Sequence, residues 1–139
     1  MWPEDSFTIR SINYPKLYVE LNSAFDQENE SVSNISIQTA KSSFDKRDGT
    51  IGVKMRAQFG FDNEDGAYLQ QEDVPFWLDA QVEVIFGFSS ENDEVSEQEI
   101  ETWIENHSLR VIYPYLREAV SSLASKSGLD DVILPIIKL

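Results

Sequence analysis

Apolar and polar residues alternate along most of the first two thirds of the chain. In residues 51–61 every odd position is apolar, whereas the even positions hold Gly, Lys, Arg or Gln. Residues 79–89 largely repeat this alternation. A period of two gives an extended strand one apolar face and one polar, solvent-exposed face, which is typical of an antiparallel sheet covered on one side. Less regular patterns predict two more strands, at residues 7–21 and at about residues 32–44.

Breaks in the alternation predict where the strands bend or turn. The apolar phase of the first strand slips around Tyr14-Pro15, so a bulge or bend is expected there. Asp48-Gly49 favours a hairpin turn between the second and third strands. In the first strand the residues predicted to face the core are Phe7, Ile9, Leu17, Val19 and Leu21.

The spacing of apolar residues becomes helical after residue 95. Ser96 with Glu99 three residues later forms a capping box, which marks the start of a helix. A second helix is predicted over residues 109–123, with Pro114 as a bend or boundary, and Gly128 is a natural helix stop. Four strands followed by helices along the chain predict one α+β domain over residues 1–139. In it, a four-stranded antiparallel sheet is followed by C-terminal helices packed on one face.

The charge of the chain narrows the classes of partner. Eleven basic and 25 acidic side chains give a net charge of −14, and residues 61–105 hold 14 acidic residues and no basic one. A surface this negative repels phosphate backbones, so no nucleic-acid partner is expected. The chain shows no secretory signal, and no stretch approaches the roughly 20 apolar residues that span a bilayer. We therefore expect a cytoplasmic protein without membrane insertion.

The sequence offers little that supports catalysis or metal binding. The chain has no cysteine, which excludes disulfides, thiolate zinc sites and a cysteine nucleophile. His107 is the only histidine, and no nucleophile signature or glycine-rich phosphate loop accompanies it. Residues 61–72 match part of a calcium loop, but Phe61 occupies the first ligand position. We expect no enzyme activity, no cofactor and no metal site.

Aromatic residues stand out in the predicted connection between the third and fourth strands. Tyr68, Phe76 and Trp77 lie there among acidic residues, and Phe25 lies in the loop after the first strand. Loops are usually polar, so these four residues are candidates for binding a peptide. The alternative is a loop that folds back over the sheet and buries its own aromatic residues.

One helix motif resembles a known family. The segment Ile112-Tyr113-Pro114-Tyr115-Leu116-Arg117-Glu118-Ala119-Val120-Ser121-Ser122 resembles the helix signature of the export chaperone SecB. The likeness continues through Gly128 to Leu134-Pro135, and residues 7–12 look like the family's first strand. Two differences are visible: residues 62–78 are longer than the family's corresponding hairpin, and Lys16 stands at a position that is acidic in the family.

The resemblance implies a fold, an activity and partners. It implies protomers that assemble into dimers and tetramers, and ATP-independent holding of unfolded polypeptides in apolar grooves, from which the SecA motor receives them. Glu20 matches one acidic position of the family's partner-docking surface. Independently, we expect a homo-oligomer, because one helix covers only part of the long apolar face of such a sheet. The candidate interface residues are Leu109, Tyr113, Leu116, Val120 and Leu123.

Two functions remain open at this stage. The chain is either a SecB-like holdase for unfolded polypeptides or an adaptor of the same fold that lacks client grooves. A continuous exposed apolar groove favours the holdase, whereas loop aromatics packed onto the protein's own sheet favour the adaptor.

Overall fold

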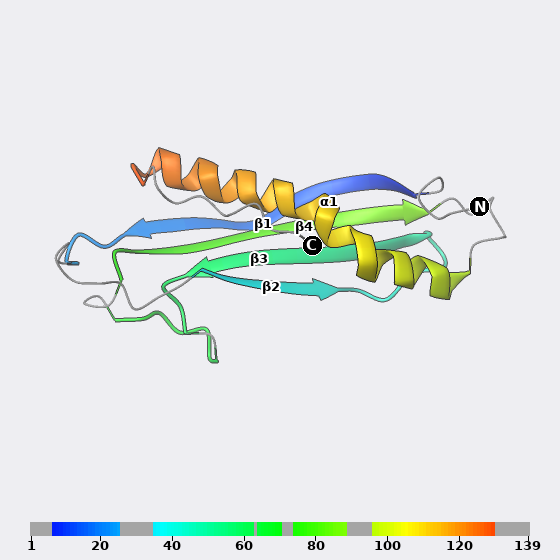
Figure 1. Cartoon of the computed structure of the whole chain (residues 1–139), viewed down its shortest axis with the longest axis horizontal. Helices are drawn as coiled ribbons and strands as arrows, with labels where there is room; N and C mark the ends of the chain where they lie inside the picture. The colour runs from blue at the N-terminus through cyan, green and yellow to red at the C-terminus, as the bar shows by residue number, and fades with distance from the viewer. Residues whose placement is uncertain (1–6, 26–34, 63, 71–73, 89–95, 130–139) are drawn as a thin grey trace.

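The part of the chain that the structure describes folds into four strands followed by one helix (Figure 1). The computed structural model describes residues 7–25, 35–62, 64–70, 74–88 and 96–129. The strands are β1 (Phe7–Leu21), β2 (Ser36–Lys41), β3 (Thr50–Phe59) and β4 (Phe76–Phe88), and the helix is α1 (Glu97–Lys126). The predicted α+β class, with four antiparallel strands before the helical part, is confirmed.

The strands pair in the order β1-β4-β3-β2, so β1 and β2 form the edges of the sheet. All pairings are antiparallel, which places directly opposite residues on the same face. The predicted irregularity of β1 is present as register shifts between Ile9 and Ser11 and between Asn13 and Lys16. The turn before β3 contains Gly49 at φ +68°, a conformation that few other residues adopt readily.

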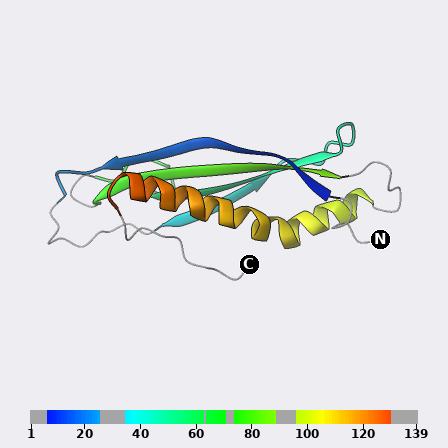
Figure 2. The same ribbon diagram turned by 90° about the horizontal axis from the view of Figure 1, so that it is seen from above.

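The helix crosses one face of the sheet diagonally, and within the described residues the opposite face carries no helix (Figures 1 and 2). Its N-terminal half lies beside β2, where Lys41 forms an ion pair with Glu105 at 3.1 Å. Its C-terminal half lies beside β1, where Glu118 acts electrostatically on Tyr14. The predicted capping box is present, with the Glu99 amide donating to the Ser96 hydroxyl at 3.2 Å.

Within residues 96–129 the structure has one helix where the sequence predicts two. Pro114 lies inside α1 on its exposed side, and the helix continues past it to Lys126. A proline in a helix interior costs about 3 kcal/mol. Burying one aliphatic side chain contributes about 1.5–3 kcal/mol. Leu116 and Val120, both fully buried beyond the proline, therefore offset that cost and keep the second half of the helix on the sheet.

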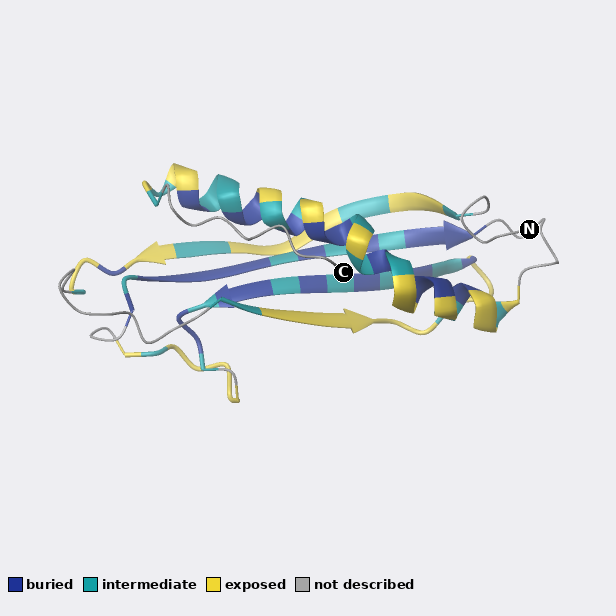
Figure 3. Cartoon of the chain, viewed as in Figure 1, coloured by how far each residue is buried: buried dark blue, intermediate teal, exposed yellow. Residues whose placement is uncertain are grey.

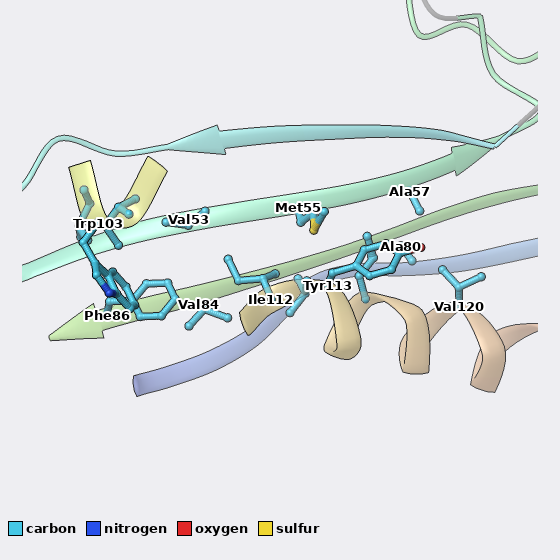
Figure 4. Close-up of a cluster of buried hydrophobic side chains, with 14 of the residues drawn as sticks. Val53, Met55, Ala57, Ala80, Val84, Phe86, Trp103, Ile112, Tyr113 and Val120 are labelled. Atoms are coloured by element: carbon cyan, nitrogen blue, oxygen red, sulfur yellow. The ribbon is translucent and has the colours of Figure 1, made fainter. Parts of the chain in front are cut away.

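The core lies between α1 and the two central strands (Figure 4). From β3 the buried side chains are every second residue from Ile51 to Ala57, and β4 supplies the matching positions on the same face. Trp103 closes one end against Phe7, with 4.4 Å between ring centroids. The helix contributes Ile100, Trp103, Ile104, Ile112, Tyr113, Leu116 and Val120.

Two strand boundaries differ from those predicted. β4 begins at Phe76 and not at Asp79, so Phe76 and Trp77 are strand residues and not loop residues. Both are buried, at 6% and 5% exposure, because they continue the β4 ladder opposite Leu21 and Glu20. β2 covers only the middle of the predicted segment, and residues 32–34 lie outside the described residues. No helix in the described ranges has the length and apolar character that crossing a membrane requires.

Candidate binding surfaces

Both edge strands, β1 and β2, carry many exposed positions (Figure 3), and several of these are large apolar residues. Among the described residues, four of the six large exposed hydrophobic side chains belong to β1, namely Ile9, Tyr14, Leu17 and Leu21. Ile9, Leu17 and Leu21 stand opposite core residues of β4, so they face the helix side as predicted. They stay 38–52% exposed because β1 is an edge strand that the diagonal helix covers only in part. We refer to these four residues as the β1 row.

A groove of about 350 Å³ lies between β2 and the N-terminal half of α1. Val53 of β3 and Ile104 and Leu109 of α1 contribute its apolar lining. Lys41 and Glu105, ion-paired across the groove, are exposed side chains at its rim. Within the part of the chain that the structure describes, the outer edge of β2 has no neighbouring strand. The groove therefore runs beside backbone groups that are open to pairing with another chain. The complete lining is Thr39, Ala40, Lys41, Val53, Ile104, Glu105, Ser108 and Leu109.

The uncovered face of the sheet is polar at its centre. Asp79 is fully buried and accepts hydrogen bonds from Arg56 at 2.9 Å and 2.5 Å and from Gln58 at 3.3 Å. Lys16 of β1 forms an ion pair with the same carboxylate at 3.3 Å, and Gln38 of β2 donates to Gln58. These five residues come from all four strands, and we call them the Asp79 network.

Burial and the neighbouring positive charges act in opposite directions on the pKa of the Asp79 carboxyl. Burial raises the pKa of the Asp79 carboxyl, because a charged group loses water there. The hydrogen bonds and positive charges of Arg56 and Lys16 together outweigh that effect and hold the pKa below its usual value. Asp79 is therefore ionised at neutral pH, and its partners are positioned as a structural unit across the sheet.

An aromatic patch covers one end of the same uncovered face. It consists of Tyr18 of β1, Trp77 of β4, and Phe61 and Tyr68 from the β3–β4 connection. The Tyr68 ring lies 4.7 Å from Phe61, 5.9 Å from Trp77 and 6.4 Å from Tyr18, measured between centroids. The Trp77 indole donates to the Leu69 carbonyl at 3.3 Å, which ties the connection to the sheet. Phe61 and Trp77 form the buried base of the patch, and Tyr68 is 56% exposed.

Three predicted site residues meet at this patch. Glu20 stands opposite Trp77 in the β1–β4 register, and it accepts a hydrogen bond from the Tyr18 hydroxyl. Hydrogen bonds to Glu20 and to Tyr68 raise the pKa of Tyr18. Tyr68, Trp77 and Glu20 are thus brought together although they come from three separate segments.

The other two peptide-binding candidates lie elsewhere. Phe76 points to the helix-covered face and stacks on Phe59, with 4.3 Å between centroids. Phe25 is half-buried in the turn after β1, where its amide donates to the Asn22 carbonyl at 3.2 Å. The structure brings neither residue to the aromatic patch.

The helix residues predicted as an oligomer interface pack against the chain's own sheet. Tyr113, Leu116 and Val120 are buried against the sheet, and Leu109 and Leu123 pack beside them. Side chains that are already buried within one chain have little surface left for a second copy. Among the described residues, most of the large exposed apolar side chains belong to the β1 row.

The sequence patterns did not predict the groove beside β2 or the place of Tyr18 in the aromatic patch. The groove is lined by residues from three elements, and no single segment carries a pattern that reveals it. Tyr18 belongs to a strand whose alternation places it on the uncovered face, which was visible in the sequence. Its neighbours on that face were not visible, because they depend on the pairing of β1 with β4.

Comparison with solved structures identifies the architecture. The chain superposes on the SecB-like chaperone Rv1957 of Mycobacterium tuberculosis, solved in complex with a ChAD peptide from the HigA1 antitoxin Rv1956, with a TM-score of 0.68. The match covers 98% of this chain and 94% of that one, at 17% sequence identity. The chain has a SecB-like fold.

The remaining comparisons add no assignment. A protein of unknown function from Streptococcus agalactiae matches with a TM-score of 0.40 and 11% identity over 94% of this chain and 97% of its own. No family model matches the sequence, and no curated protein does. The SecB-like fold therefore rests on the three-dimensional arrangement, together with the helix motif around Pro114 in the sequence.

Proposed function

We propose that this protein is a SecB-like, ATP-independent chaperone that holds extended apolar segments of unfolded polypeptides in the cytoplasm. The observation that carries the proposal is the apolar groove between β2 and α1, which lies beside the open edge of β2. The solved SecB-like structure, which contains a bound peptide, supports a polypeptide as the ligand class. The proposed activity is binding alone, without catalysis or cofactor.

The geometry suits a client in extended conformation. A client strand that pairs with β2 gains backbone hydrogen bonds, and every second side chain then faces the groove. Apolar burial contributes about 25 cal/mol per Å². Ordering the client opposes this gain, so the affinity for any one segment stays modest. The net charge of −14 favours clients that carry basic residues among the apolar ones.

Suppression of aggregation tests this proposal. A guanidinium-denatured enzyme diluted into buffer is expected to stay in solution at a stoichiometric ratio of this protein, without ATP. Thr39→Glu, which places a carboxylate in the groove, is expected to weaken the suppression. Ser36→Glu is the matched control, because it adds the same charge to the same strand at a position outside the groove lining, opposite Gln58 on the uncovered face. Aggregation that proceeds unchanged with the wild-type protein would count decisively against a holdase.

One observation favours the adaptor as a second candidate. Phe76 and Trp77 pack within the chain's own structure and present little surface to a client. An adaptor of the SecB-like fold would bind one folded or partly folded partner in stoichiometric amounts. Affinity capture separates the two: many unfolded polypeptides indicate a holdase, and one stoichiometric partner indicates an adaptor.

We further propose that the protein assembles into a dimer or tetramer through β1. The β1 row exposes four large apolar side chains on an edge strand of 15 residues, within the described part of the chain. An edge strand with exposed apolar residues readily pairs with another strand unless charge or covering prevents it. Pairing with a second copy would bury this row.

A further inference from the structure

The hydrogen bonds between β2 and β3 determine which backbone groups of β2 are open to another chain. The Ser42 amide donates to the Gly52 carbonyl at 2.8 Å, so the backbone groups of residue 42 are directed at β3. In an antiparallel pair, such positions alternate with positions whose backbone groups point away from the partner strand. The register carries this alternation back through β2. Ile37, Thr39 and Lys41 therefore turn their N–H and C=O groups to the open edge.

The side chains of these three residues lie on the helix-covered face. Thr39 and Lys41 line the groove, and Ile37 is 36% exposed. Their partners in β3 are buried core residues, namely Ala57, Met55 and Val53. A strand that pairs with the open edge therefore places every second side chain beside Ile37, Thr39 and Lys41.

The charge around this edge is opposite in sign to that of the whole chain. Residues 36–59 hold five basic and two acidic side chains, whereas the chain as a whole carries −14. The Lys41 side chain is 38% exposed and forms its ion pair with Glu105 at 3.1 Å. An ammonium group has three donors, so Lys41 can bind a second carboxylate and keep Glu105. Because salt screens distant charges beyond about 10 Å, the nearest charged group dominates at this position.

We propose that Lys41 selects clients that carry an acidic residue at one position of the segment bound to β2. The client strand pairs antiparallel with β2, the geometry that is more stable per residue. Its acidic side chain faces Lys41, and apolar side chains two and four residues later face Thr39 and Ile37. Opposite charges across a strand pair attract, and like charges repel. This selection rests on the proposed binding of clients beside β2 and adds the residue type that the site recognises.

Fluorescence anisotropy with three matched peptides tests the selection. A short fluorescein-labelled peptide contains the core Glu-Thr-Val-Thr-Val, and glutamine or lysine replaces the glutamate in the other two. The glutamate peptide is expected to bind the wild-type protein about two- to fivefold more tightly than the glutamine peptide, and the lysine peptide to bind weakest. Attraction by the net charge of −14 alone predicts the reverse order.

Variants at the edge assign the preference to Lys41. Lys41→Gln is expected to remove the preference for glutamate over glutamine, and Lys41→Glu to make the lysine peptide the tightest of the three. Glu105→Gln leaves Lys41 unshared, so it is expected to increase the preference for glutamate. Lys54→Gln is the matched control, because it removes the same charge from β3 on the uncovered face, outside the groove lining. Equal urea midpoints show that the variants retain the fold.

Three results would overturn the selection by Lys41. The first is tightest binding of the lysine peptide to the wild-type protein, and the second is equal affinity for all three peptides. The third is no binding of any peptide by a protein that does suppress aggregation, because client recognition would then lie away from this edge. Tighter binding of the reversed core Val-Thr-Val-Thr-Glu would overturn the antiparallel register. The proposed holdase activity is measured separately by aggregation, so it can stand when the selection fails.

Discussion

Replacing the buried carboxylate of Asp79 with an amide tests whether the Asp79 network holds the sheet together. Asp79→Asn keeps the shape of the side chain and removes its charge. Arg56 donates to both carboxylate oxygens, and the two strongest contacts measure 2.9 Å and 2.5 Å. After the change, the amide group presents donors to a guanidinium that also has only donors. Lys16 loses its ion-pair partner at the same time.

The size of the stability loss in Asp79→Asn depends on how far its partners Arg56 and Lys16 are buried. Removing one partner of a fully buried ion pair costs about 3–5 kcal/mol, mainly because the other charge is stranded. Here the Arg56 and Lys16 side chains are 34% and 46% exposed, so both can turn toward water. The substitution also removes the cost of desolvating the carboxylate. We therefore expect a loss of about 2–3 kcal/mol in the free energy of unfolding at pH 7.

Urea unfolding at several pH values measures this loss and its origin. The pKa of Asp79 is lowered in the folded state, so its contribution is fully present above the unfolded pKa of about 4. It is lost as the pH falls through the lower folded pKa. The difference between wild type and Asp79→Asn should therefore be full at pH 7 and shrink below about pH 4.

Glu83→Gln serves as the control, because it neutralises a carboxylate on the same strand and the same face that is less buried than Asp79. It is expected to change stability by less than about 0.5 kcal/mol. The reasoning fails if Asp79→Asn is as stable as wild type at pH 7. It also fails if the deficit stays constant on acidification, because the lost interaction would then not depend on ionised Asp79.

Two further predictions concern assembly and backbone geometry. Light scattering should give the wild-type protein two or four times its chain mass of 15.9 kDa. Leu17→Arg in the β1 row should lower that mass, whereas Ile37→Arg on the opposite edge strand, β2, should not. A wild-type protein that is monomeric at micromolar concentration would rule out assembly through β1. Gly60→Ala should destabilise the fold by more than about 2 kcal/mol, because φ is +89° and the new Cβ would lie 2.7 Å from Trp77 Cδ1 and 2.8 Å from the Phe76 carbonyl. Gly66 has φ +71° and no atom near the position of a new Cβ, so Gly66→Ala should lower the free energy of unfolding in urea by only about 1 kcal/mol. Equal losses of stability in Gly60→Ala and Gly66→Ala would contradict the steric explanation.

The sequence alone determined the strands and the face that each presents to the core. Alternation is a local property, since the side chains of a strand point to opposite faces whatever the strand pairs with. The positions from Ile51 to Ala57 and from Ala80 to Phe88 were assigned to the core correctly for this reason. The capping box at Ser96 is local in the same sense. The helix motif around Pro114 indicated the SecB-like fold, which the structural comparison confirms.

Helix continuity and strand boundaries depended on contacts that no local pattern contains. Pro114 is unfavourable in any isolated helix, and α1 continues through it because Leu116 and Val120 are buried on the sheet. Phe76 and Trp77 look like loop residues beside Pro75 and several acidic residues. They extend β4 because β1 reaches as far as Leu21 and pairs with them.

The tertiary structure also decided which residues are available to a partner. Leu17 and Val53 both read as inward positions of alternating strands, but Leu17 is 49% exposed and Val53 3% exposed. The difference comes from the strand order, which puts β1 at an edge and β3 in the interior under the helix. The aromatic patch likewise needs Tyr18, Tyr68 and Trp77 from three distant segments. Pairing of β1 with β4 and the return of the β3–β4 connection bring them together, and both are properties of the whole fold.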